Sequence, residues 1–222
     1  MNFFFIFYLL SGIIFSQSKI FSTIDGSVEE IIYSSSFWLS GSPAIDPTTE
    51  NRFIIQSGIS SVLIVDNKNI FKYPNLNIGL KVSKNLSLIC RSYGFRSGDY
   101  SPHILGGGIQ YYYGGRDTLS WSTSLQRNDL KGLKNFSLTS LKIDLQKWLL
   151  WNNYKFCVGL GSNFFKQSSV GEYSDFPKSM KGQINYICFR MMVPISIFSL
   201  GIDSQIALRQ KMVTLYLQKE FF

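Results

Sequence analysis

Residues 118–126 read Thr-Leu-Ser-Trp-Ser-Thr-Ser-Leu-Gln, and this stretch decides the fold of the chain. Its odd-numbered positions carry Leu, Trp, Thr and Leu, and its even-numbered positions carry Thr, Ser, Ser, Ser and Gln. Successive side chains of a β-strand point to opposite faces, so this period of two predicts a strand with one apolar and one polar face.

The same alternation recurs along most of the chain. We expect about ten strands, near residues 52–65, 75–83, 86–95, 104–113, 118–126, 135–147, 154–165, 182–193, 197–206 and 211–222. The alternative is twelve strands, with two more drawn from residues 28–39. Alternation alone fits either a membrane barrel or a soluble sandwich, because both have one polar face per strand.

The predicted connections separate these two folds. Tight turns are expected at 84–85, 114–117 and 194–196, and longer connections at 96–102, 127–134 and 166–180, while residues 207–210 form a short exception. Alternating short and long connections are typical of outer-membrane barrels, whose periplasmic turns are tight. The sequence therefore predicts an all-β, up-and-down antiparallel transmembrane β-barrel, with both termini on the periplasmic side. A secreted soluble β-protein that binds a ligand is the alternative.

Composition favours a surface that faces lipid. Charged residues make up 16% of the chain, below the roughly 25% of ordinary soluble proteins, and aromatic residues also make up 16%. The net charge is +8, but the basic residues are scattered rather than clustered, which argues against a nucleic-acid partner. Anionic lipid head groups are a further candidate contact for them.

The N-terminal region divides into two parts ahead of the barrel. Residues 2–15 form an uncharged apolar run followed by Ser16-Gln17-Ser18, which predicts a cleaved signal peptide at 1–18. An uncleaved anchor is the alternative. Residues 19–51 are expected at the periplasmic mouth or inside the barrel as a plug, and residues 52–222 form the barrel.

The C-terminal stretch 213–222 reads Val-Thr-Leu-Tyr-Leu-Gln-Lys-Glu-Phe-Phe. It resembles the last strand of bacterial outer-membrane proteins, in which alternating apolar residues lead to a terminal aromatic residue that the barrel-assembly machinery reads. Lys219 interrupts the register, and Phe222 lies one step outside it. The resemblance implies that Phe221 and Phe222 form the assembly signal. It places the chain in the outer membrane of a Gram-negative-type bacterium, with outer-membrane lipid and that machinery as partners.

A second resemblance precedes the barrel. Ser42-Pro43-Ala44-Ile45 is similar to the Asn-Pro-Ala-Gly-Leu element ahead of the first strand in FadL-like and PorV-like barrels. Pro43 and Ala44 match, and Ser42 replaces the asparagine. The resemblance implies a barrel of that group and carries no site residues with it.

Charged and amide side chains fall on the polar faces of the predicted strands. The candidate lumen-lining residues are Lys81, Arg91, Gln110, Lys142, Asp144, Lys155, Arg190 and Asp203. A barrel of eight to ten strands is narrow and is filled by its own side chains. We therefore favour a packed polar interior over an open channel.

No residue pattern predicts catalysis or a metal site. Ser101-Pro102-His103, with Asp99 as a third member, is the one candidate for a lipid-modifying barrel enzyme, but neighbouring loop residues seldom form a catalytic pair. The three cysteines lack the short spacing of a zinc site, and the chain has one histidine. We expect no cofactor.

Two of the cysteines are expected to be neighbours. Cys157 and Cys188 fall at similar depth on consecutive antiparallel strands, so they are expected side by side, and a disulfide between them is left open. Cys90 shares the face of Leu86 and Leu88, and we expect it free and turned to lipid.

The sequence thus predicts a non-enzymatic, porin-like outer-membrane barrel. Transport of small or hydrophobic molecules and a role as a membrane scaffold both remain open, and no residue identifies a substrate.

Overall fold

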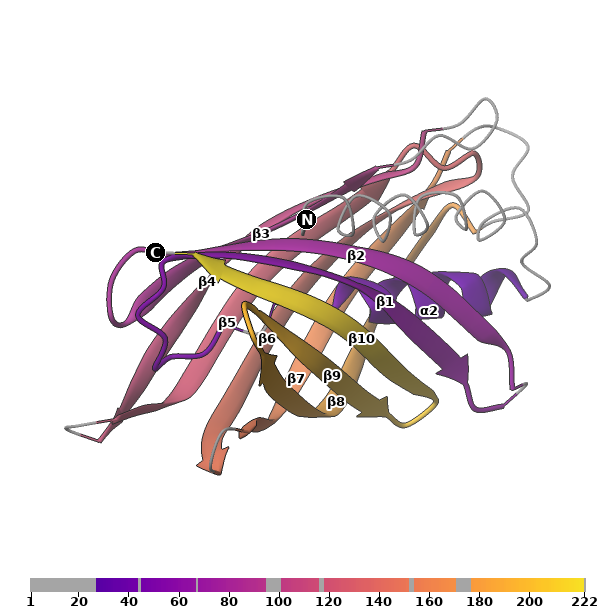
Figure 1. The fold of residues 1–222 in the computed structure, drawn as a ribbon. Helices are drawn as coiled ribbons and strands as arrows, with labels where there is room; N and C mark the ends of the chain where they lie inside the picture. Colours follow the sequence, from indigo (N-terminus) through magenta and orange to yellow (C-terminus); the bar gives the residue numbers. More distant parts are fainter. Residues whose placement is uncertain are drawn as a thin grey trace.

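The chain folds into a closed barrel of ten antiparallel strands in the order β1-β10-β9-β8-β7-β6-β5-β4-β3-β2 (Figure 1). This computed structural model describes residues 27–221 except 44, 67, 95–100, 116–117, 152–153 and 171–176. The strands are β1 (Phe53–Ile64), β2 (Ile70–Lys81), β3 (Leu86–Gly94), β4 (His103–Gly115), β5 (Thr118–Lys131), β6 (Phe136–Trp151), β7 (Tyr154–Ser169), β8 (Ser179–Ile195), β9 (Phe198–Ala207) and β10 (Gln210–Phe221). Every strand pairs with its neighbours in sequence, and β1 closes the barrel on β10, from Phe53 opposite Phe221 to Ile64 opposite Gln210. The predicted ten-stranded up-and-down barrel is confirmed.

The two ends of the barrel differ in their connections. At one end, here called the short-turn end, the strands are joined by residues 82–85, 116–117, 152–153 and 196–197, and β10 ends there. At the other, the long-loop end, they are joined by residues 65–69, 95–102, 132–135, 170–178 and 208–209. The predicted alternation holds at 95–102 and 170–178 and at the short exception near residue 208, but the connection at 132–135 is no longer than the turn at 82–85.

The twelve-stranded alternative is wrong, because residues 28–39 form a helix, α2 (Val28–Leu39). Ser27 caps it by accepting a hydrogen bond from the Glu30 backbone N–H at 3.3 Å. Ser-x-x-Glu is a capping box, and Glu29 and Glu30 in the first turn complement the positive end of the helix dipole. These local signals outweigh the strand propensity of Ile31 and Ile32.

Six strands, β2 and β4 to β8, are longer than predicted. β5 continues to Lys131, so the connection expected at 127–134 shrinks to residues 132–135, and β6 continues to Trp151. The polar run Arg127-Asn128-Asp129 suggested a loop, but it is strand. Arg127 and Asp129 form an ion pair on the outer face, while Asn128 is fully buried on the inner face.

Burial is inverted relative to a soluble β-protein. The side chains that point outward are large, apolar and exposed over the middle of each strand, among them Ile59, Leu125, Ile143, Leu160, Ile187, Ile202 and Leu215. The buried side chains of the inner face are of two kinds: polar ones, namely Ser, Asn, Gln, Lys, Arg and Asp, and nearly as many apolar and aromatic ones, many of which pack against α2 in one hydrophobic cluster. The predicted two-faced strands are therefore present, with the polar face inside a closed barrel rather than on the surface of a sandwich.

Outward-facing aromatic residues gather at the short-turn end. Phe53 contacts Phe221 with ring centroids 5.8 Å apart, and Tyr154 and Trp151 each lie 6.4 Å from Phe156. Trp148, near the same end of β6, points inward and donates from Nε1 to Ser122 at 3.2 Å. None of the helices in the described part of the chain is long and apolar enough to cross a membrane.

The plugged barrel interior as candidate functional site

Helix α2 and the segment after it occupy the interior of the barrel from one end to the other. At the long-loop end, Asn69 donates to Glu30 in the first turn of α2 at 2.9 Å. At the short-turn end, Thr49 donates to Glu220 near the end of β10 at 2.6 Å. Residue 27 therefore lies at the long-loop end, whereas β1 begins and β10 ends at the short-turn end.

Donors from the barrel wall bind the free carbonyl groups at the C-terminal end of α2. A helix leaves its last four carbonyls without helical partners, and buried carbonyls need donors. Asn163 of β7 donates to the Ser36 oxygen at 2.8 Å, and Asn128 of β5 donates to the Leu39 oxygen at 2.6 Å. Arg91 of β3 donates to the Trp38 oxygen at 2.9 Å, which sets a cation against the negative end of the helix dipole.

Aromatic and apolar contacts fix the faces of α2. Trp38 stacks on Tyr73 of β2 with ring centroids 4.4 Å apart, and its Nε1 donates to Asn75 at 3.0 Å. Tyr73 in turn shares a 2.9 Å hydrogen bond with Ser34. On the far wall, Phe37 meets Tyr186 of β8 edge to face at 6.0 Å. The helix thus contacts opposite sides of the barrel at once.

The segment that follows α2 is held by charged side chains of the inner face. Arg190 of β8 donates to the Ser42 oxygen at 3.4 Å, and Lys155 of β7 pairs with Asp46 at 2.6 Å. Lys81 at the end of β2 donates to the oxygens of Pro47 and Thr49. Positive side chains of the wall therefore bind the backbone oxygens and the carboxylate of this segment.

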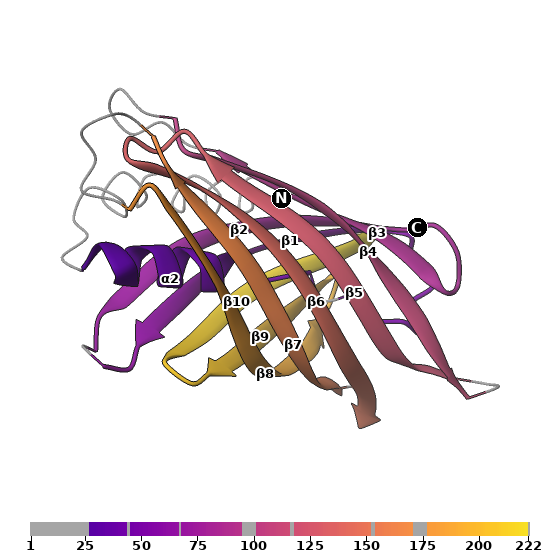
Figure 2. The same cartoon turned by 180° about the vertical axis from the view of Figure 1, so that it is seen from behind.

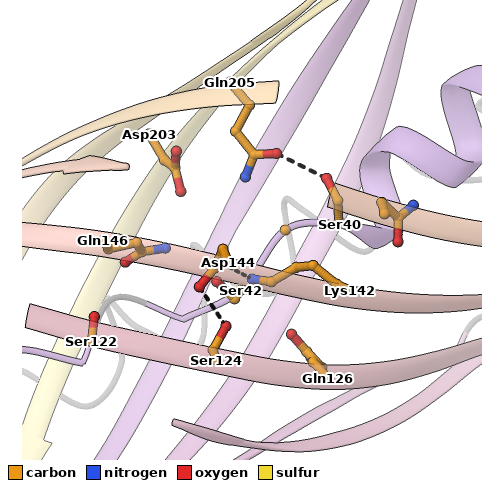
Figure 3. A network of polar contacts seen from close by, with 12 residues as sticks. Ser40, Ser42, Ser122, Ser124, Gln126, Lys142, Asp144, Gln146, Asp203 and Gln205 are labelled. Carbon is orange, nitrogen blue, oxygen red and sulfur yellow. Dashed lines mark hydrogen bonds and ion pairs between the residues drawn. The ribbon is translucent and has the colours of Figure 1, made fainter. Parts of the chain in front are cut away.

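Two ion pairs lie within the wall itself. Lys142 Nζ is 2.6 Å from Asp144 Oδ2, and Arg190 Nη2 is 2.6 Å from Asp203 Oδ2, with all four side chains at least nine-tenths buried. Figure 3 shows Asp144 also accepting from Ser124, and Ser40 of the segment donating to Gln205. Buried charges persist when paired and hydrogen-bonded, so these pairs hold the polar interior in one arrangement.

All eight candidate lumen residues lie on the inner face. The side chain of Lys155 is partly exposed, and the other seven are buried: Lys81, Arg91, Gln110, Lys142, Asp144, Arg190 and Asp203. Four of the eight contact α2 or the segment after it: Lys81, Arg91, Lys155 and Arg190. Asp203 forms an ion pair with Arg190. The structure thus brings these five residues together around the plug rather than around an empty channel.

The other candidate residues are more widely spread. Phe221 is the last described residue of β10, and Phe222 and Asp99 lie outside the described residues. His103 Nδ1 contacts the backbone oxygen of Ser101 at 2.9 Å, rather than its hydroxyl, so the two do not form a nucleophile–base pair.

The cysteines are free. Cys157 lies opposite Arg190, and Cys188 lies opposite Gly159, so the two thiols share the inner face but are offset diagonally by two residues rather than directly side by side as predicted. Cys90 falls on the outward parity of β3, as expected. Among the residues that the structure describes, no group of His, Cys, Asp or Glu could hold a metal ion.

Several residues of the interior were missed by sequence reasoning. Tyr73 fell outside the strand predicted at 75–83, which begins after Pro74, a poor strand residue, and the role of Asn75 in binding the plug was not predicted. In the structure, β2 pairs with β3 only from Asn77 onward, so Pro74 lies where β2 has a single neighbour and its missing N–H leaves no gap. Ser27-Val28-Glu29-Glu30 is the signal that could have revealed α2.

Comparisons with known proteins give a limited similarity. No family model matches the chain, and neither does any curated protein. Among solved structures, it is similar to Ail, the attachment invasion locus protein of Yersinia pestis, with 14% identity over 78% of this chain and 99% of that one and a TM-score of 0.28. It is also similar to the KdgM porin in complex with disordered oligogalacturonate, with 9% identity over 76% and 99% of the two chains and a TM-score of 0.41. Similarity at this level says nothing about what this chain does.

Proposed function

We propose that the protein is an integral outer-membrane β-barrel, without enzymatic activity, whose interior is closed by its own N-terminal segment. The observation that carries the proposal is the inverted burial: exposed apolar side chains cover the outer face, and the polar side chains are packed inside a closed barrel. A surface of this kind is stable in hydrocarbon and unfavourable in water. Aromatic residues at the short-turn end match one of the two interface girdles of such barrels, and the short connections at this end match their periplasmic turns.

The filled interior favours a gated or scaffolding role over an open pore. Helix α2 contacts opposite walls, and the carbonyls at its C-terminal end are bound by wall side chains, so the helix lies across the interior and obstructs it. Transport of a small or hydrophobic molecule therefore requires either movement of the plug or a route through the barrel wall. A FadL-like or PorV-like role, which Pro43 and Ala44 suggest, is compatible with either route.

Assembly is proposed to use the C-terminal strand. Val213, Leu215 and Leu217 point outward from β10 as the resemblance implies, and Phe221 ends the strand opposite Phe53. Lys219, which breaks the apolar register, lies over the rings of Phe198 and Phe221 at 5.4 and 4.9 Å. A cation beside aromatic rings is favourable at the lipid–water interface, so this position keeps the strand suited to a membrane.

The closed interior predicts a conductance experiment. In planar lipid bilayers, the wild-type protein is expected to show no steady ion conductance, whereas a variant lacking residues 28–39 is expected to show discrete open steps, because the barrel loses the helix that fills it. A heat-modifiable gel shift for both proteins is the control for folding. Steady conductance of equal size in both would show that α2 does not close the barrel.

A further inference from the structure

The barrel wall has a gap at the long-loop end. β8 pairs with β9 only from Tyr186, which lies opposite Ala207, so residues 179–185 of β8 pair with β7 alone. β9 then turns into β10 at residues 208–209. In Figure 2 the first turns of α2 lie at this place with no strand drawn in front of them. Among the residues that the structure describes, no strand therefore covers the N-terminal end of the plug on this side.

A cavity of about 460 Å³ lies in the gap, between the first turn of α2 and the two turns beside it. It is lined by the carboxylates Glu29, Glu30 and Asp66 and by a single basic side chain, that of Arg209. Gln210 also lines it, and this side chain is only 4% exposed while its Oε1 has no hydrogen-bond partner among the described residues. A buried acceptor of this kind needs a donor, so the cavity presents acceptors and negative charge.

An apolar groove on the outer face adjoins this cavity, which is called the chamber below. The groove has a volume of about 790 Å³ and is lined by residues of β4 to β9, among them Leu145, Leu160, Ile187 and Ile206. Asn185, Ala207 and Leu208 line both spaces, and Leu208 is 96% exposed. The acidic chamber thus lies next to an apolar groove on the outer face.

We propose that this pair of spaces binds a single-chain amphiphile with a primary ammonium head. The ammonium group would lie in the chamber, where it donates to the carboxylates and to Gln210 Oε1, and the hydrocarbon chain would lie in the groove. With three carboxylates against one guanidinium, the chamber disfavours a carboxylate or phosphate head. The inference rests on the proposed function, because a hydrocarbon chain binds in this groove only if the outer face of the barrel lies in lipid.

Binding is tested by isothermal titration of the full chain in phosphatidylcholine nanodiscs, with protein-free nanodiscs subtracted. Decylamine is expected to bind with saturation, whereas decanoate and decanol, which have the same chain length, are expected to show only partition into lipid. The Glu29→Gln/Asp66→Asn variant is expected to bind decylamine about tenfold more weakly or worse. Glu50→Gln, an exposed carboxylate at the short-turn end, is the matched control and is expected to bind as the wild type does.

The groove is tested with a shorter amine. Ile187→Ser, at a residue that lines the groove but not the chamber, is expected to weaken decylamine binding and to leave the weaker binding of butylamine unchanged, because the short chain does not reach the groove. Equal heats for decylamine, decanoate and decanol, or equal decylamine affinity in the double variant and Glu50→Gln, would overturn the proposal. Protein that inserts into vesicles but shows either result would remain a membrane barrel, so failure of this site is distinguishable from failure of the proposed function.

Discussion

Replacing Asp203 with alanine is expected to lower the free energy of unfolding by about 3–5 kcal/mol, because it leaves the Arg190 guanidinium buried and unpaired. Arg190 donates to Asp203 Oδ2 from both Nε and Nη2, at 3.1 and 2.6 Å. Both residues are almost completely buried, so water cannot replace the lost carboxylate. The measurement is urea unfolding of the protein in phosphatidylcholine vesicles, followed by circular dichroism and by the gel shift of the folded barrel.

The double variant Arg190→Met/Asp203→Leu is the control for this prediction. Removing both charges replaces the ion pair with apolar groups of similar size, so the double variant is expected to be more stable than Asp203→Ala alone. If Asp203→Ala costs less than about 1 kcal/mol, the pair behaves like an exposed salt bridge and the interior is hydrated rather than packed.

Arginine in place of Leu215 is expected to cost about 2–4 kcal/mol of stability in the bilayer, since it sets a charge on the outer face near the membrane midplane. Leu215 lies in the middle of β10, is 59% exposed, and is flanked in register by Ile59 and Ile202, which also point outward. Its exposure means that the cost comes from lipid rather than from protein packing. The same unfolding measurement in vesicles gives the value.

The matched control is Ile70→Arg. Ile70 is 62% exposed and is the first residue of β2, at the long-loop rim of the barrel, where the added charge can reach water. Its expected cost is about 0–1 kcal/mol. Equal costs at Leu215 and Ile70 would contradict a hydrocarbon layer around the middle of the barrel.

The fold could be read from the sequence because a barrel wall repeats one simple pattern. Alternation at 118–126 and its repeats give the strands and the face to which each side chain points, and the inner-face placement of Arg91, Lys142 and Asp203 follows from parity alone. Errors came where local composition was ambiguous. Polar residues of β5 such as Asn128 looked like loop because their partner, the carbonyl of Leu39, lies about ninety residues earlier in the chain.

The plug could be anticipated as a segment but not as a helix across the interior. Its stability comes from contacts of long sequence separation, such as Asn163 with Ser36 and Arg91 with Trp38, which no local pattern reveals. The diagonal offset of Cys157 and Cys188 has a similar origin, because the register of β7 on β8 is set by pairing along the whole hairpin and not by the midpoint of its loop.

Quenching of single tryptophans by bromine on lipid acyl chains tests most directly whether the outer face lies in hydrocarbon. The chain supplies its own controls, because Trp121 points outward while Trp38 lies in the plug and Trp148 on the inner face. In three variants that each keep one of these residues and carry phenylalanine at the other tryptophans, Trp121 is expected to be strongly quenched in brominated vesicles, and Trp38 and Trp148 to be nearly unaffected. Equal quenching of all three, or no quenching of Trp121, would contradict a membrane barrel closed by its own N-terminal segment.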